Sequence, residues 1–162
     1  MQNILLVAAV ADERFLRDLG CEVLRQDDMR LLAELPDTPR MLRTIENLRP
    51  DVLLLDEALA APVDGRRNSV IGDVLRASPA TKTLLVTDGR DERCVARALQ
   101  RGARGCVSSN APGGELLRAI RAVSRGEVWV GRKEMASVLD VLLTRLERRA
   151  NDSSGKFAHL LS

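Results

Sequence analysis

Aromatic side chains are scarce in this sequence, whose 162 residues include two Phe, one Trp and no Tyr. The basic residues therefore lack aromatic neighbours and do not form the footprint of a nucleic-acid-binding surface. Cysteine is also scarce. Cys21, Cys94 and Cys106 are odd in number and lack the spacing of metal ligands, which indicates reduced thiols in a cytoplasmic protein.

A long apolar run and a signal peptide are both lacking, so we expect a soluble chain without contact to a membrane. The chain is 45% hydrophobic, and its length suits one domain with a core plus an appendage. Its formal net charge is +2, with the basic surplus lying after Gly89. Such a surplus would suit a position beside a DNA-binding neighbour.

The stretch from Asp51 to Asp56 is the element around which the sequence is organised. Four apolar residues lie between two carboxylates, and so short a run predicts a fully buried strand of a parallel sheet. In doubly wound α/β domains, ligands bind at the carboxyl ends of the central strands. Asp56 lies at that end and is therefore the first candidate functional residue.

Short apolar runs alternate with amphipathic segments over the first 130 residues. We expect strands within residues 4–9, 30–35, 51–56, 83–87 and 105–109. We expect helices within residues 12–24, 38–48, 69–75, 90–100 and 112–126. In the first helix Leu24 is expected on the inner face, and Gly20 is expected to interrupt the helix or to end it early. Residues 58–68, which include Asp64 and Gly65, are expected to form a loop. The alternation predicts a three-layer α/β domain with a parallel sheet.

Two groups of residues make the sequence similar to a known family. Asp51 to Asp56, followed by Asp64-Gly65, resembles the phospho-acceptor strand and loop of the receiver domain of two-component response regulators. The more specific match runs from Leu84 to Val130 and resembles the NarL/LuxR branch, through Leu84-Leu-Val-Thr87, Ala98 to Gly105, Glu115 to Val123 and Gly126-Glu-Val-Trp129. The resemblance implies a flavodoxin-like (CheY-like) doubly wound sheet of five parallel strands in the order 2-1-3-4-5.

A receiver of this family accepts a phosphoryl group from a histidine kinase, so the resemblance implies a phospho-acceptor at Asp56 and a switch hydroxyl at Thr87. Other positions depart from the family pattern. The two acidic Mg²⁺ ligands, the phosphate-binding lysine and the switch aromatic of the family correspond to Ala8 and Ala9, Ser109 and Cys106. Phosphoryl transfer to an anion needs cationic help, which these residues do not supply. We therefore expect an atypical receiver without enzymatic activity, a metal or a cofactor.

A sixth amphipathic segment, within residues 132–149, follows the receiver pattern. We expect a receiver domain at 1–130, and at 131–162 a linker helix and tail that lead to a missing DNA-binding output domain, which the resemblance implies. Asn151 to Gly155 has the composition of a linker. The apolar positions of this helix predict the seam of a homodimer, formed by Met135, Val138, Leu139, Leu142 and Leu146.

The sequence leaves three functions open. The first is regulation of a DNA-binding output domain by dimerisation without phosphorylation. The second is a true phospho-acceptor at Asp56 in a histidine-kinase phosphorelay, with an improvised Mg²⁺ site that draws on Asp12, Glu57 or Asp88. The third is a small-molecule sensor with a strand-end pocket, which would be lined by Ala8, Ala9, Asp56 and Thr87.

Overall fold

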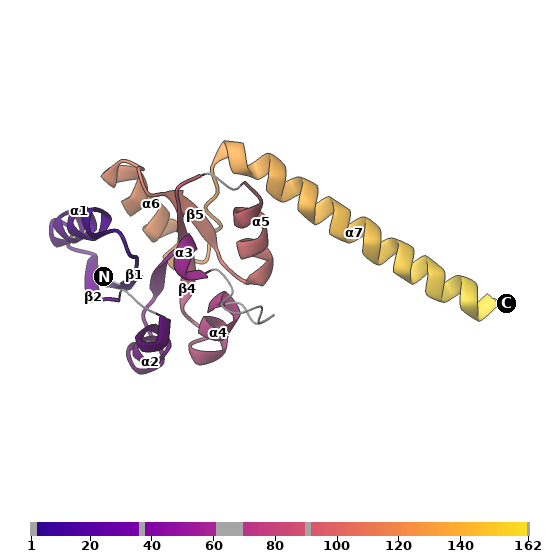
Figure 1. The fold of residues 1–162 in the computed structure, drawn as a ribbon, viewed down its shortest axis with the longest axis horizontal. Coiled ribbons are helices and arrows are strands. Elements are labelled where there is room, and N and C mark those ends of the chain that lie inside the picture. Colours follow the sequence, from indigo (N-terminus) through magenta and orange to yellow (C-terminus); the bar gives the residue numbers. More distant parts are fainter. Residues whose placement is uncertain (1–2, 36–37, 61–69, 90–91, 162) are drawn as a thin grey trace.

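A five-stranded parallel sheet forms the centre of the molecule (Figure 1). The structure, a computed structural model, describes residues 3–35, 38–60, 70–89 and 92–161. The strands are β1 (Ile4–Ala9), β2 (Met29–Glu34), β3 (Val52–Asp56), β4 (Lys82–Thr87) and β5 (Gly105–Ser108). Their order is β2-β1-β3-β4-β5, which confirms the expected doubly wound, flavodoxin-like fold.

Helices cover both faces of this sheet. They are α1 (Glu13–Leu24), α2 (Thr38–Leu48), α3 (Glu57–Ala60), α4 (Val70–Ala77), α5 (Glu92–Arg101), α6 (Gly113–Ser124) and α7 (Arg132–Leu161). Helices α1 and α6 pack on one face, and α2, α4 and α5 pack on the other. Strand β3 lies at the centre, and Val52 to Leu55 alternate between the two cores and are fully buried. This burial explains why the strand is apolar along its whole length.

Helix α1 differs from the sequence-based prediction at two residues. The helix continues through Gly20 to Leu24, so the expected interruption was wrong. The Asp12 side chain caps its start, and buried Phe15 and Val23 hold both ends against the sheet. Leu24 was expected on the inner face, yet it is 87% exposed because the buried stripe of the helix ends at Val23.

Replacing Gly20 with alanine is expected to raise the free energy of unfolding by about 0.5–1 kcal/mol, because alanine loses less backbone entropy in a helix. A Cβ atom at Gly20 would meet no atom within 4 Å. Gly126→Ala is the matched control, since its Cβ would also meet open space but its φ is +87°. Urea unfolding should show Gly20→Ala above the wild type and Gly126→Ala below it. A loss of stability in Gly20→Ala would contradict the expectation.

The segment after β3 is helical at first, where a loop was expected. Glu57 to Ala60 form the single turn α3, with Ala60 buried against the sheet. Asp64 and Gly65 lie outside the described residues. Within the described part of the chain, no helix is long and apolar enough to cross a membrane.

The outer edge of β5 is covered by the chain that follows α6. Gly105 forms a parallel bridge with Trp129, the Cys106 amide donates to the Trp129 carbonyl at 2.9 Å, and the Trp129 amide donates to the Arg104 carbonyl at 3.1 Å. These bonds hold the residues from which α7 starts. The long helix then passes beside α5 and extends away from the sheet (Figure 1).

Helix α7 is longer than predicted. It continues past Arg149 to Leu161, so residues 151–155, which have the composition of a linker, are helical. Each residue added to an existing helix completes a further backbone hydrogen bond, and one glycine costs only about 1 kcal/mol.

Val138 was expected in the dimer seam, but the packing of α7 places it in the core of its own domain. Its side chain is only 7% exposed and packs into the core of its own domain, with Val141 beside it. Helix α5 lies against this face of α7. Val138 therefore fixes α7 to the receiver and is not part of a surface that a partner can reach.

Candidate functional site

An open cavity lies at the carboxyl ends of β1, β3 and β4. Its volume is about 480 Å³, and its lining is formed by Val10, Asp12, Asp56, Glu57, Ala58, Val86, Thr87, Asp88 and Ser109. The sequence-predicted residues Asp56, Thr87 and Ser109 thus meet at one cavity. Parallel strands bring them together, because their carboxyl ends lie at the same edge of the sheet.

Asp56 is half-buried at the end of β3, and both of its carboxylate oxygens are engaged. Oδ2 accepts a hydrogen bond from the Ala11 amide at 3.2 Å, and Oδ1 accepts one from the Ala58 amide at 3.1 Å. The two amides come from the segments that follow β1 and β3. Backbone N–H groups therefore hold the carboxylate in place at the mouth of the cavity.

Thr87 ends β4 and is only 5% exposed. Its hydroxyl donates to Glu57 Oε2 at 2.5 Å and accepts from the Gly89 amide at 3.1 Å. The pairing with Glu57 was not predicted, because the direction of a side chain beyond a strand end cannot be inferred from sequence spacing. The one feature of the sequence that pointed to this pairing was the carboxylate directly after Asp56, and it was interpreted only as a possible metal ligand.

Ala8 and Ala9 do not line the cavity, contrary to expectation. Both are fully buried within β1, with Ala8 facing the α1 and α6 side and Ala9 facing the other core. The register pairs Ala9 with Leu55, so the residues that follow Ala9 lie beside Asp56. Val10 lines the cavity and Ala11 contacts Asp56, and neither carries a carboxylate.

The residues present do not fit the Mg²⁺ ion that the receiver resemblance implies. Mg²⁺ requires oxygen ligands in near-octahedral geometry. Asp12 Oδ1 instead caps α1, where it accepts from the Arg14 and Phe15 amides at 2.9 and 3.3 Å. Glu57 is bound to Thr87. Among the described residues, no three His, Cys, Asp or Glu side chains are grouped so that they could hold a metal ion.

The charged residues among the described lining of the cavity are all acidic. Four carboxylate side chains line it, and none of its described lining residues is Lys or Arg. An anionic phosphoryl donor that enters the cavity would therefore meet carboxylates among its described lining residues. This arrangement opposes phosphoryl transfer, because the reaction brings two anions together.

Cys106, at the position of the family's aromatic residue, packs as a small apolar side chain. It is buried in the core that includes α5 and Val138. Burial raises the pKa of the Cys106 thiol to about 11, and the nearby negative charge of Glu134 adds to the increase. The thiol therefore stays protonated at neutral pH and is a poor nucleophile.

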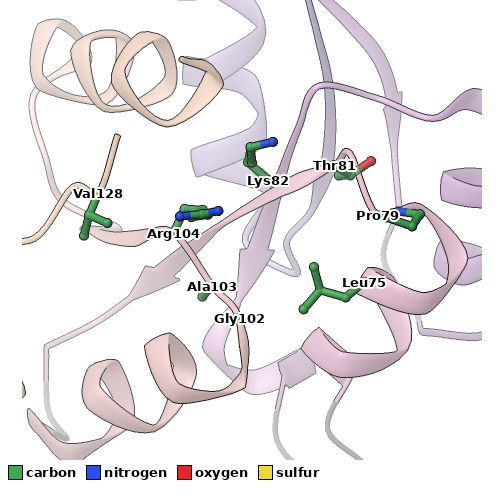
Figure 2. Close-up of a pocket in the computed structure, with 8 residues that line it drawn as sticks. All are labelled: Leu75, Pro79, Thr81, Lys82, Gly102, Ala103, Arg104 and Val128. Atoms are coloured by element: carbon green, nitrogen blue, oxygen red, sulfur yellow. The ribbon is translucent and has the colours of Figure 1, made fainter. Parts of the chain in front are cut away.

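A second, smaller cavity of about 270 Å³ lies at the other end of the sheet (Figure 2). Leu75 extends toward the turn at Gly102, and Arg104 and Val128 lie on the far side (Figure 2). Two of its polar side chains bond to the backbone, since the Thr81 hydroxyl donates to the Pro50 carbonyl at 2.6 Å and Lys82 Nζ donates to the Ala80 carbonyl at 3.2 Å. The cavity at Asp56 is therefore the candidate site.

A doubly wound sheet with an aspartate ending β3 and a threonine ending β4 defines a receiver-like α/β domain. Residues 7–121 match the family described as the response regulator receiver domain, and the chain belongs to that family. This assignment confirms the resemblance found in the sequence.

Named relatives fall in the same branch. The chain is 32% identical over 133 residues to the oxygen regulatory protein NreC of Staphylococcus aureus (strain MRSA252) and 28% identical over 132 residues to NreC of Staphylococcus carnosus. Each match covers 82% of this chain and 60% of the relative. The chain thus spans about 60% of the length of these curated relatives.

Solved structures show the same fold at low sequence identity. The RcsB response regulator of Salmonella typhimurium has a TM-score of 0.70 and 18% identity, over 86% of this chain and 68% of that chain. The receiver domain of the response regulator NarL from Mycobacterium tuberculosis has a TM-score of 0.66 and 22% identity, over 78% of this chain and 100% of that chain.

Proposed function

We propose that this receiver regulates a DNA-binding output domain by forming a homodimer through α7, without phosphorylation at Asp56. The output domain is inferred from the family, in which longer regulators join a receiver to a DNA-binding part. The proposal gives the chain no enzymatic activity and no cofactor. It also assigns the protein to the cytoplasm, where its three free cysteines would stay reduced.

The observation that carries the proposal is an exposed apolar stripe on α7. Met135, Leu139, Leu142 and Leu146 are 39%, 51%, 45% and 60% exposed. Their spacing of four, three and four residues is that of alternating d and a positions in a coiled coil. Leu143 lies beside the stripe and is also exposed.

The stripe lies on a different face of α7 from the residues that bind the receiver. With 3.6 residues per turn, Val138 and Val141 point about 70° and about 130° away from the centre of the stripe. Helix α7 can therefore pack on its own domain and on a partner at the same time. The dimer does not require α7 to leave α5.

A second copy of this chain is the partner that fits the stripe best. The stripe is apolar and repeats in heptads, so two copies can pack it against itself about a twofold axis. Burying one leucine side chain contributes about 1.5–3 kcal/mol. A parallel pair would bring the two carboxyl ends of α7 together, which suits output domains that bind paired half-sites on DNA.

The cavity supports the part of the proposal that excludes phosphorylation. Both oxygens of Asp56 accept backbone hydrogen bonds, and Glu57, the next residue in the sequence, is bound to Thr87. With Val10 and Ala11 at the end of β1, an incoming phosphoryl group would find no metal and no cation among the described lining residues.

Incubation with Mg²⁺ and acetyl phosphate is expected to leave the intact mass unchanged, because the described residues that line the cavity include no Lys or Arg to neutralise the donor at Asp56. Asp56→Asn is the control, and a receiver with the complete family site is the positive reference. Sedimentation equilibrium should give the same dimer dissociation constant for the wild type and Asp56→Asn, with or without beryllofluoride. A stoichiometric phosphoryl mass gain that is lost in Asp56→Asn would instead establish Asp56 as a phospho-acceptor.

A further inference from the structure

The contact between Glu57 and Thr87 gives the cavity a bound anion of its own. The two residues are 30 positions apart, and Thr87 is almost fully buried. A threonine hydroxyl carries a single proton, and here that proton is directed at Glu57 Oε2. A hydrogen bond to a charged carboxylate is shorter and stronger than one between neutral groups.

We propose that the Glu57 carboxylate is an internal anion that holds Thr87 permanently and so keeps the receiver in its dimerising state. This inference rests on the proposed function, because it names what takes the place of phosphorylation in the same cavity. Glu57 acts through Thr87 and is a positioning residue. It does not react.

The Glu57–Thr87 contact extends to Gly89, at the start of the connection that leads to α5. The Thr87 oxygen that donates to Glu57 also accepts from the amide of Gly89, whose φ is +80°. Gly89 lies in the connection between β4 and α5, and α5 packs along α7. Glu57 therefore positions the start of the segment that supports the proposed dimer helix.

Glu57 also competes with any second anion in the cavity. A phosphoryl group on the neighbouring Asp56 would add negative charge beside Glu57, Asp12 and Asp88. It would also need the Thr87 proton, which Glu57 already holds. Because one proton cannot serve two anions, binding of the internal carboxylate and binding of an external phosphoryl group exclude each other.

Two variants of Glu57 separate the role of the side chain from general stability. Glu57→Ala removes the acceptor, whereas Glu57→Gln keeps a carbonyl oxygen in the same place. Nuclear magnetic resonance on the intact chain should detect the slowly exchanging hydroxyl proton of Thr87 in the wild type. This signal should be absent in Glu57→Ala and present in Glu57→Gln. The amide resonance of Gly89 should shift in Glu57→Ala and in Thr87→Val alike.

Sedimentation equilibrium then tests the link to dimerisation. Loss of the charge-assisted hydrogen bond should raise the dimer dissociation constant of Glu57→Ala by about tenfold, and Glu57→Gln, which keeps only a neutral acceptor, should lie between Glu57→Ala and the wild type. Glu57→Ala together with Thr87→Val should weaken the dimer no more than either change alone, because both remove the same bond.

The outcomes distinguish this inference from the function on which it rests. A wild type that stays monomeric, or that gains a phosphoryl group at Asp56, overturns the proposed function. A wild type that dimerises and resists phosphorylation, while Glu57→Ala leaves the Thr87 hydroxyl proton or the dimer constant unchanged, overturns the role of Glu57 alone. Unchanged circular dichroism of Glu57→Ala confirms that the fold persists in either case.

Discussion

Replacing Leu139 and Leu142 with glutamate is expected to weaken self-association at least about a hundredfold, because the dimer would lose four buried leucine side chains. Both residues are about half exposed in the single chain, so the variant should remain folded. The new carboxylates would also face each other across a parallel seam and repel. Sedimentation equilibrium of the intact chain measures the dissociation constant directly.

Thr144→Glu is the matched control for this double substitution. Thr144 is exposed on α7, nearly half a turn of the helix away from the stripe, and its hydroxyl donates only to the Asp140 carbonyl. The control should dimerise like the wild type. Deleting α7 would be a poorer test, because it removes Val138 and uncovers the core beneath. An unchanged dimer in Leu139→Glu with Leu142→Glu would move the interface away from α7.

Replacing Gly105 with alanine is expected to lower the free energy of unfolding by about 2–4 kcal/mol, through overpacking and the loss of edge hydrogen bonds. A Cβ at Gly105 would lie 2.3 Å from the Trp129 carbonyl oxygen and 3.0 Å from both the Trp129 carbonyl carbon and amide nitrogen. These are backbone atoms, so they cannot turn aside as a flexible side chain would. The strand edge would have to separate from the chain that leads to α7.

Trp129 makes this effect easy to follow, because it is the only tryptophan in the sequence. Its fluorescence should shift to longer wavelength in Gly105→Ala as the side chain gains access to water, and the urea midpoint should fall. Gly114→Ala is the control, since its Cβ would meet no atom within 4 Å. The expectation is wrong if both variants unfold at the same urea concentration.

In the proposed dimer, helix α7 has two contacts. One face packs on its own receiver domain, and the next face packs on the partner. Val138 and Val141 bury one face against the domain, while Leu139 and Leu142 leave the next face exposed. If the proposed dimer forms, any shift of α5 would move the stripe as a rigid part of the receiver. The Glu57–Thr87 contact would then be able to control the dimer although it lies far from α7 in the sequence.

The sequence by itself determined the fold and the location of the site. Alternating strand and helix patterns are local properties, so they predicted the α/β class, and the receiver resemblance supplied the sheet order that the structure confirms. Asp56 and Thr87 could be assigned to one edge because each directly ends an apolar run, and parallel strands end on the same side. The roles proposed for them remain predictions.

Only the tertiary structure decided which neighbours these residues meet. The register of β1 against β3 placed Ala9 beside Leu55, which moved both alanines into the sheet and left Val10 at the cavity. The position of α5 decided that Val138 is buried while Leu139 stays exposed. The partner of Thr87 likewise depended on how Glu57 turns beyond the strand end. Such contacts join residues far apart in sequence, and local periodicity carries no information about the distances between them.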